Sequence, residues 1–383
     1  MMRFRTLVSA TIAALMVSTS LVQAAEFKIG VAMGLTGAAA PAAEIQVKGM
    51  QAAIAVVNAR GGIGGMPAKL VICDTQTVEQ QAVLCARRLL FDDQVNLLLG
   101  TGNTPQTLAI LPTVEQAGVP TFAVAGGTVT FRPLKKWVFK AVATNDDLVR
   151  GALQYAKAKG YKTLANIRDS GATGSDVAAV LKVAAEEFGL EVVAEETYAP
   201  TDTDMTAQLT RIRAANPDVI INMASTSAPG AIIAKKIVQL GMKQPIMVST
   251  ILQSPSYIQL AGPEAAAQTA FVGYKATVAD ESSSALGANF AAFKSELAKA
   301  DPEAKIVGLT LTGVDGILLA QAAAKDLGEK ALDPVELLRG LESLKAVPGM
   351  QGEWTFSADN HETSLLTGMT VLKHSDGNWV EAE

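Results

Sequence analysis

Two segments rich in hydroxyl groups and glycine follow predicted strands of this chain, and the chemistry they offer is hydrogen-bond donation. Residues 100–105 place Thr104 and Pro105 at the start of a predicted helix, and residues 125–128 follow the next predicted strand. Threonine suits the cap of a helix and proline its first position. Thr104 would therefore present a hydroxyl and neighbouring amides to an anion, while small residues at 125–128 let backbone donors approach closely. Together the two loops predict a site for one carboxylate.

A second group of segments offers similar chemistry later in the chain. Residues 170–174, 224–227 and 249–250 again follow predicted strands and contain hydroxyl groups and small residues rather than charges. Each Ser or Thr taken alone is equally typical of a cap or turn, so the prediction depends on their coincidence at strand ends. The candidate ligand-binding residues are Asn103, Thr104, Ala125, Gly126, Gly127, Thr128, Thr173, Ser225, Thr226 and Thr250.

Motifs for catalysis and for cofactor binding are missing from the sequence. It has no Gly-x-Ser-x-Gly elbow, no phosphate loop ending in Gly-Lys-Ser/Thr and no His-Glu-x-x-His. Its only histidines, His361 and His374, are remote in sequence from its only cysteines, Cys73 and Cys85, which argues against a metal site. We therefore expect a protein that is not an enzyme and carries no cofactor.

The two cysteines suggest a small disulfide loop. Cys73 falls near the end of one predicted strand and Cys85 midway along the following predicted helix, which runs back over the sheet, so the two side chains could lie at the same height. An even pair in an oxidising compartment favours a bridge. Two separate buried thiols are the alternative.

The first 24 residues read as a secretory leader. Arg3 and Arg5 form a basic start, residues 6–22 are apolar but rich in Ser and Thr, and residues 22–24 fit a cleavage site of small residues. We expect cleavage near Ala24 and export to the periplasm, with an uncleaved anchor helix as the alternative.

Charge and composition exclude several classes of protein. Without the leader, the chain has 30 basic and 37 acidic residues, a formal charge of −7, and no long basic run. Nucleic-acid binding is therefore not expected. Almost half of the residues are hydrophobic, at 49%, which indicates layered, well-packed cores rather than disorder.

Short apolar runs alternate with longer helical patterns along nearly the whole chain. This alternation predicts an α/β fold of two lobes, each an open parallel sheet flanked by helices. The predicted strands are 27–32, 69–73, 95–99, 120–124 and 137–141, then 163–168, 191–198, 218–223 and 245–248. The predicted helices are 45–59, 79–91, 105–117, 147–159, 175–188, 205–214, 229–240, 287–300, 306–324 and 334–344.

The order of these elements predicts lobes built from separated segments. We expect residues 1–24 to be the signal peptide, residues 25–142 and 276–352 to form the first lobe, and residues 143–275 and 353–383 to form the second. Three chain crossings would then join the lobes as a hinge.

Several short motifs resemble those of a known family. The segments 28–37, 58–65, 115–120, 201–205 and 352–356 are similar, in order and spacing, to landmarks of the periplasmic solute-binding proteins of ABC importers. The resemblance is to the type I fold and to its branched-chain amino acid (Leu/Ile/Val-binding) group, over essentially the whole mature chain. It implies a monomeric receptor that closes on a small solute and delivers it to a permease in the inner membrane.

Position by position, the resemblance places ligand contacts and also shows departures. Thr104 resembles the hydroxyl residue that holds the ligand carboxylate, and residues 125–127 match a second loop that gives backbone contacts. Thr173 and Ser225 fall where aromatic residues often close over the ligand. Thr250 falls where amino-acid binders carry an acid that pairs with the ammonium group, and in the first loop an aromatic residue is replaced by Ala42.

These departures bear on the solute. A buried ammonium group without a carboxylate partner costs several kcal/mol, so the resemblance implies a small organic acid rather than a standard α-amino acid, unless Asp169 or a backbone cluster compensates. A branched-chain amino acid or an amide-like ligand remains the alternative. A second functional alternative is a sensor domain that uses the same cleft to regulate a membrane partner.

Overall fold

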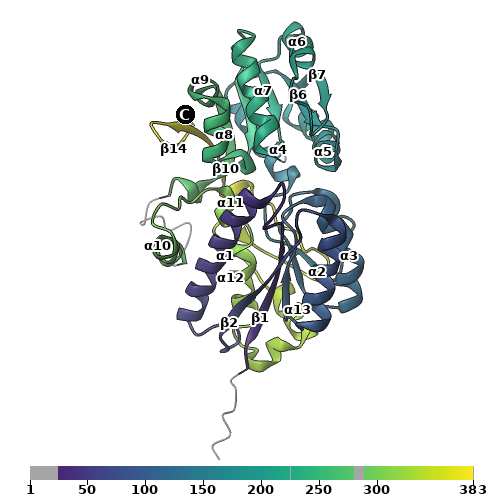
Figure 1. Cartoon of the computed structure of the whole chain (residues 1–383). Coiled ribbons are helices and arrows are strands. Elements are labelled where there is room, and N and C mark those ends of the chain that lie inside the picture. Colours follow the sequence, from purple (N-terminus) through teal and green to yellow (C-terminus); the bar gives the residue numbers. More distant parts are fainter. Residues whose placement is uncertain (1–24, 225, 280–288, 383) are drawn as a thin grey trace, which may run out of the picture.

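The computed structural model describes residues 25–224, 226–279 and 289–382. Two separate β-sheets, each flanked by helices, form two bodies that lie one above the other (Figure 1). The predicted two-lobed α/β fold is confirmed. The predicted leader and the candidate ligand residue Ser225 lie outside the described residues. Among the residues described, no helix combines the length and the apolar character needed to span a membrane.

The first sheet has five strands in the order β2-β1-β3-β4-β5, all parallel. Its central strands are short and wholly apolar or nearly so, as expected for strands covered on both faces. The strands are β1 (Phe27–Met33), β2 (Ala68–Asp74), β3 (Leu97–Leu99), β4 (Thr121–Ala123) and β5 (Val138–Lys140). The helices between them are α1 (Ala40–Ala59), α2 (Glu79–Arg87) and α3 (Thr104–Ala117), with single turns η1 (Arg88–Asp92) and η2 (Thr128–Thr130).

The second sheet has seven strands in the order β14-β13-β10-β9-β8-β6-β7. Its first five strands in chain order are parallel, and the last two pair antiparallel at one edge. The strands are β6 (Thr163–Asp169), β7 (Glu191–Tyr198), β8 (Val219–Asn222), β9 (Ile246–Ser249), β10 (Thr269–Tyr274), β13 (Met369–Ser375) and β14 (Asn378–Glu381). The helical elements are α4 (Asn145–Ala158), α5 (Ala172–Phe188), α6 (Thr206–Ala215), α7 (Ser227–Gln239), η3 (Thr250–Leu252), α8 (Pro255–Ala261), α9 (Pro263–Ala267) and η4 (Lys275–Thr277).

The segment after β10 returns to the first lobe, where α10 and α12 pack on α1. The single helix predicted over 306–324 is two helices, because Thr312 is extended and Gly313, the N-cap of the second helix, adopts a left-handed conformation with φ of 80°. The elements of this segment are α10 (Asn289–Ala300), α11 (Gly308–Leu311), α12 (Val314–Ala323), η6 (Gly328–Leu332), α13 (Pro334–Glu342), β11 (Val347–Pro348), β12 (Glu353–Trp354) and η7 (Leu366–Gly368).

The chain reaches the second sheet later than the expected boundary at residue 353. Phe356 packs against Phe122 of β4 and Phe139 of β5, with ring centroids 6.4 Å and 5.2 Å away, and Trp354 packs on Phe356. Both residues therefore belong to the core of the first lobe. The return to the second sheet follows Phe356 and is complete at β13.

The main apolar core extends beyond the first lobe. The cluster that contains Ile29 of β1 and Leu337 of α13 also contains Val149 of α4 and Tyr274 of β10 in the second lobe. A smaller cluster is confined to the second lobe and lies around Ile167 of β6, where α6 and α7 pack. The two lobes thus share one continuous apolar interior.

The predicted disulfide is confirmed. Cys73 of β2 and Cys85 of α2 form a bridge with a Cα–Cα distance of 5.6 Å. It fixes α2 on the edge strand of the first sheet.

Asp315 is a buried carboxyl group that makes stability depend on pH. It joins α12 to the β11–β12 segment by accepting hydrogen bonds from Met350 N, Gln351 N and Trp354 Nε1, at 2.6 Å, 3.0 Å and 2.9 Å. These donors favour the charged form, but complete burial outweighs them and raises the pKa of Asp315 from 3.8 to about 6.

We expect Asp315 to lower stability as pH rises. Because its pKa in the folded state lies above the unfolded value, its contribution is complete below about pH 4 and is lost as pH rises through about 6. The free energy of unfolding of the wild type, minus that of Asp315→Asn, should fall by about 2 kcal/mol between pH 4 and pH 7. Urea denaturation at several pH values measures this difference, and a constant difference would contradict the assignment.

Candidate functional site

Two predicted donor loops of the first lobe meet in the structure. An ideal Cβ at Gly127 would lie 2.4 Å from both Oγ1 and Cγ2 of Thr104, so the loop after β4 lies directly against the first residue of α3. Thr104 is buried, and its hydroxyl makes no hydrogen bond to the described residues. The hydroxyl and the backbone N–H of Thr104, at the start of α3, are therefore held beside a glycine backbone, an arrangement that suits an anion.

The cap of α3 differs from the expectation by one residue. Asn103, not Thr104, is the N-cap, and its side chain accepts a hydrogen bond from Gln106 N at 3.0 Å. Asparagine is as good a cap as threonine. The shift leaves the Thr104 hydroxyl free of the capping role, while Asn103 has a structural partner.

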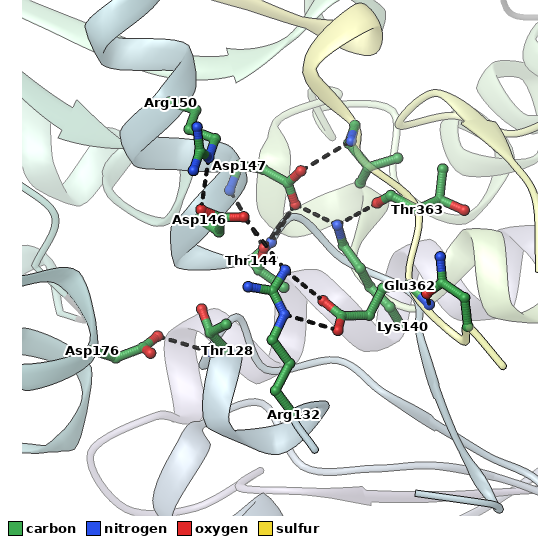
Figure 2. Close-up of polar contacts among 12 residues, drawn as sticks. Thr128, Arg132, Lys140, Thr144, Asp146, Asp147, Arg150, Asp176, Glu362 and Thr363 are labelled. Atoms are coloured by element: carbon green, nitrogen blue, oxygen red, sulfur yellow. Dashed lines mark hydrogen bonds and ion pairs between the residues drawn. The ribbon is translucent and has the colours of Figure 1, made fainter. Parts of the chain in front are cut away.

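Thr128 connects this site to the second lobe. Its backbone N–H donates to Asp176 Oδ2 of α5 at 2.8 Å, and its own hydroxyl is buried without a partner. Gly126 accepts a hydrogen bond from Asn145 N at 2.7 Å, and Ala125 before it is buried. The side chain of Asp176 points toward Thr128 (Figure 2).

The ligand-binding residues predicted in the second lobe differ from one another in burial and in local surroundings. Thr173 lies in the first turn of α5, half-buried, one turn before Asp176. Thr226 is the exposed N-cap residue of α7 and makes no capping side-chain bond. Thr250 is buried and lies directly against Gly308 of α11. A Cβ atom added at Gly308 would lie 1.6 Å from Thr250 Oγ1. The structure thus brings Thr104, Gly127 and Thr128 together with the helix of Thr173.

Unpaired polar atoms mark the carboxyl ends of two strands in the second lobe. Asp169, the last residue of β6, accepts a hydrogen bond from Gly171 N at Oδ1, while its Oδ2 is buried without a partner. Asn222, the last residue of β8, donates to Ile167 O at 2.6 Å, and its Oδ1 has no partner. Tyr198, which pairs with Asp169 at the end of the neighbouring strand β7, is also buried, and this burial raises its pKa to about 12. Acceptors that lack donors are thus available at this end of the sheet.

A charged cluster that the sequence did not predict lies where the lobes join. Lys140 of β5 is buried and donates to Asp147 of α4 and, at 2.5 Å, to Thr363 O (Figure 2). Asp147 also accepts hydrogen bonds from Thr144, its partner in a capping box, and from Leu365 N at 3.0 Å. Three chain segments are therefore tied to one buried ion pair.

Surface ion pairs and a pocket surround this cluster. Arg132 pairs with Glu362 and Asp146, and Arg150 pairs with Asp146 (Figure 2). A polar pocket of about 290 Å³ lies beside Lys140. A shallower groove of about 940 Å³ lies between α5 and β7. None of the predicted ligand-binding residues lines either cavity.

The histidines have structural surroundings. His361 is buried and stacks on Phe139 with ring centroids 3.8 Å apart, and His374 packs against Trp379. Within the described part of the chain, no group of three or more His, Cys, Asp or Glu side chains could hold a metal ion.

Two open sheets with donor loops at the carboxyl ends of their strands are characteristic of the two-lobed binding proteins, whose ligands lie between the lobes. The model of the periplasmic binding protein family matches residues 26–378, and the chain belongs to this family. The resemblance found in the sequence is confirmed at that level.

Curated relatives carry Leu/Ile/Val-binding names. The chain is 25% identical to the Leu/Ile/Val-binding protein BraC3 of Rhizobium johnstonii over 365 residues, which is 94% of each protein. It is 26% identical to the Leu/Ile/Val-binding protein homolog 3 of Brucella melitensis over 63% of this chain and 66% of that protein. Matches to several others span just over half of the relative, for example 53% of an amino acid binding protein of Pseudomonas aeruginosa.

Solved structures share the fold. An extracellular ligand-binding receptor from Rhodopseudomonas palustris HaA2 superposes with a TM-score of 0.81 at 24% identity, over 94% of this chain and 100% of that one. The branched-chain amino acid transporter substrate-binding protein LivJ of Streptococcus pneumoniae, solved in complex with isoleucine, gives 0.77 at 21% identity, over 94% and 100%. At these identities the likeness concerns the fold alone.

Proposed function

We propose that this protein is an extracytoplasmic receptor that captures a small carboxylate-bearing solute between its two lobes and delivers it to an ABC permease in the inner membrane. The observation that supports this most is the contact between Thr104 and Gly127 at the start of α3. The predicted leader supports export to the periplasm, and we expect the receptor to act as a monomer.

The site favours a carboxylate for electrostatic reasons. The start of α3 carries the positive end of the helix dipole. The N–H of Thr104 has no partner within the helix, whereas Pro105 has no N–H and Gln106 N donates to the Asn103 side chain. The hydroxyls of Thr104 and Thr128 can each donate a hydrogen bond, and both side chains are buried. Donors held in a poorly hydrated site bind an anion more strongly than water-exposed donors do.

Capture would proceed by closure of the lobes on the solute. The solute contacts residues of both lobes, so it stabilises the closed arrangement by the difference in its affinity for the closed and open states. The permease then recognises the closed shape. Thr128 and Asp176, which come from different lobes, lie where such closure would take place.

The names of the relatives favour one particular alternative ligand. Several relatives are named as Leu/Ile/Val-binding proteins, so a branched-chain amino acid is the second candidate. Thr250 in place of the acid expected for such ligands weighs against it, whereas other acidic residues of the second lobe could compensate.

A panel of solutes tests the proposal. Differential scanning fluorimetry with amino acids, benzoate-type acids and aliphatic acids should show a rise in Tm with at least one carboxylate, because a ligand that binds the folded state stabilises it. Thr104→Ala should weaken that ligand by roughly tenfold or more. Thr113→Ala removes a buried threonine further along α3 and should leave affinity unchanged. Absence of any shift across the panel would contradict the proposal.

A further inference from the structure

Strand β2 forms one edge of the first sheet, next to β1 (Figure 1). At its two ends, Phe27 N donates to Pro67 O, and Thr75 N donates to Met33 O. Because the backbone groups of successive strand residues point to alternate sides, the odd-numbered residues of β2 bond to β1. The even-numbered residues turn their N–H and C=O groups away from the sheet, and these residues are Ala68, Leu70, Ile72 and Asp74.

Only the middle of this outward row is open. Asn58 of α1 covers Ala68, since its side chain accepts a hydrogen bond from Ala68 N and donates one to Ala68 O, both at 2.8 Å. At the other end, Cys85 Sγ lies 3.4 Å from Asp74 O. Among the residues that the structure describes, none is hydrogen-bonded to the outward backbone groups of Leu70 and Ile72.

The side chains around this open edge are apolar. Leu70, Val71 and Ile72 are only half-buried, although all three are large aliphatic residues. Lys69 is the one charged residue in the segment 68–73, and it forms an ion pair with Glu26. An apolar edge strand that lacks free charges is prone to pair with another strand.

Two other edge strands differ from β2 in this respect. The outer edge of β5 is partly covered, because Lys140 N donates to His361 O. The edge strand β7 of the second sheet carries Glu191, Glu195 and Glu196. In a pair of β7 strands these acids would be crowded together, which opposes association. Pairing is therefore favoured at β2.

We infer that two copies of this protein associate through β2, whose strands pair antiparallel about a two-fold axis at Val71 and join the two first sheets into one. Leu70 of each copy then exchanges two hydrogen bonds with Ile72 of the other, so every open backbone group gains a partner. Val71 faces Val71 of the second copy. The two Lys69 residues lie four strand positions apart, about 13 Å, so they do not repel each other strongly.

This association goes beyond the proposed function and leaves solute capture to each copy. It uses the side of the sheet, whereas the Thr104 and Gly127 loops lie at the carboxyl ends of the strands. A single strand pair buries little surface, so we expect a reversible dimer with a Kd of roughly 10–500 μM. At lower concentration the receptor acts as the expected monomer.

Sedimentation velocity of the purified protein at about 5 μM to 1 mM tests the inference. The average mass of the wild type should rise from that of one chain toward that of two. Val71→Lys should remain at one chain throughout, because it places two ammonium groups opposite each other at the axis. In the single chain the lysine stem can lie along the half-buried surface with its ammonium group in water.

Two control variants separate the edge from general effects of substitution. Val71→Thr keeps the branched side chain that suits a strand, and it should still associate. Val192→Lys makes the same exchange on β7, where the side chain is 37% exposed. It should associate as the wild type does.

Val71→Cys tests the register. Residues that face each other in an antiparallel pair without shared hydrogen bonds have Cα atoms about 4.5 Å apart, which is within reach of a disulfide. Air oxidation should therefore join residue 71 of one copy to residue 71 of the other. Leu70→Cys places the two thiols two strand positions apart, about 7 Å along the strands, and should not crosslink. Non-reducing electrophoresis and peptide mapping distinguish these crosslinks from the Cys73–Cys85 bridge.

The inference fails under any of three results. The first is a mass of one chain for the wild type at about 1 mM. The second is equal association of the wild type and Val71→Lys, which would place the contact elsewhere. The third is crosslinking of Leu70→Cys but not of Val71→Cys, and this measurement stays decisive if Val71→Lys proves unstable. The solute panel measures capture separately, so each proposal can fail without the other.

Discussion

Gly127→Ala is expected to abolish binding of the carboxylate solute. A methyl group at this position would lie 2.4 Å from the hydroxyl oxygen and the methyl carbon of Thr104, which is far inside van der Waals contact. The backbone of Gly127, with φ of −66° and ψ of 120°, is one that alanine adopts without strain. The substitution should therefore act by displacing the Thr104 side chain, and we expect affinity to fall by roughly 30-fold or more.

Titration calorimetry of the ligand found by the solute panel measures this effect. Gly100→Ala is the control, because its new Cβ would lie 3.5 Å from Phe122 O in ordinary contact, at the end of the neighbouring strand. The control should bind normally. Wild-type affinity in Gly127→Ala would show that the Thr104 and Gly127 loops do not form the site.

Among the substitutions proposed for this protein, Lys140→Met should lower the free energy of unfolding the most. The substitution leaves the Asp147 carboxylate buried with neutral donors only, and breaking a buried ion pair on one side costs about 3–5 kcal/mol. Both side chains are at most 5% exposed. Thr363 O also loses its donor.

Chemical denaturation of the single and double variants separates these effects. Lys140→Met/Asp147→Asn should regain part of the loss, because it removes the uncompensated charge. Lys48→Met breaks a pair with Asp301 whose side chains are 38% and 28% exposed, and it should cost less than about 1 kcal/mol. Equal losses in Lys140→Met and Lys48→Met would contradict the importance of the buried pair.

The fold could be predicted because strand-length apolar runs and helical patterns alternate so regularly. The predicted strand 27–32 and the observed strand Phe27–Met33 differ by one residue, since seven consecutive buried or half-buried residues leave few alternatives. The errors fall where local pattern is silent. Gly313 looked like an ordinary residue of a long apolar helix, and Phe356 gave no sign that its partners were Phe122 and Phe139.

The residues of the candidate site also fall into two groups, those whose arrangement the sequence predicts and those that only the tertiary structure reveals. The contact between Thr104 and Gly127 could be predicted because neighbouring parallel strands bring the loops at their carboxyl ends together, whereas their part in ligand binding stays a prediction. Asp176 could not, since an acid near the start of a helix is explained locally by the helix dipole. Its hydrogen bond with Thr128 depends on the approach of α5 to the first lobe, which only the tertiary structure supplies. Lys140 was hidden for a related reason, because a lysine at the end of a short strand usually reaches solvent.

The shared apolar interior has a consequence for how the molecule can be taken apart. Val149 and Tyr274 bury their side chains in the same cluster as Ile29 and Leu337. Separating the chain at the lobe boundary would therefore expose apolar surface on both fragments. We therefore expect neither half to fold stably by itself. The surface loops of each half can therefore vary independently. Exchange of one half for that of a relative should require compensating changes among the apolar residues where the two halves meet.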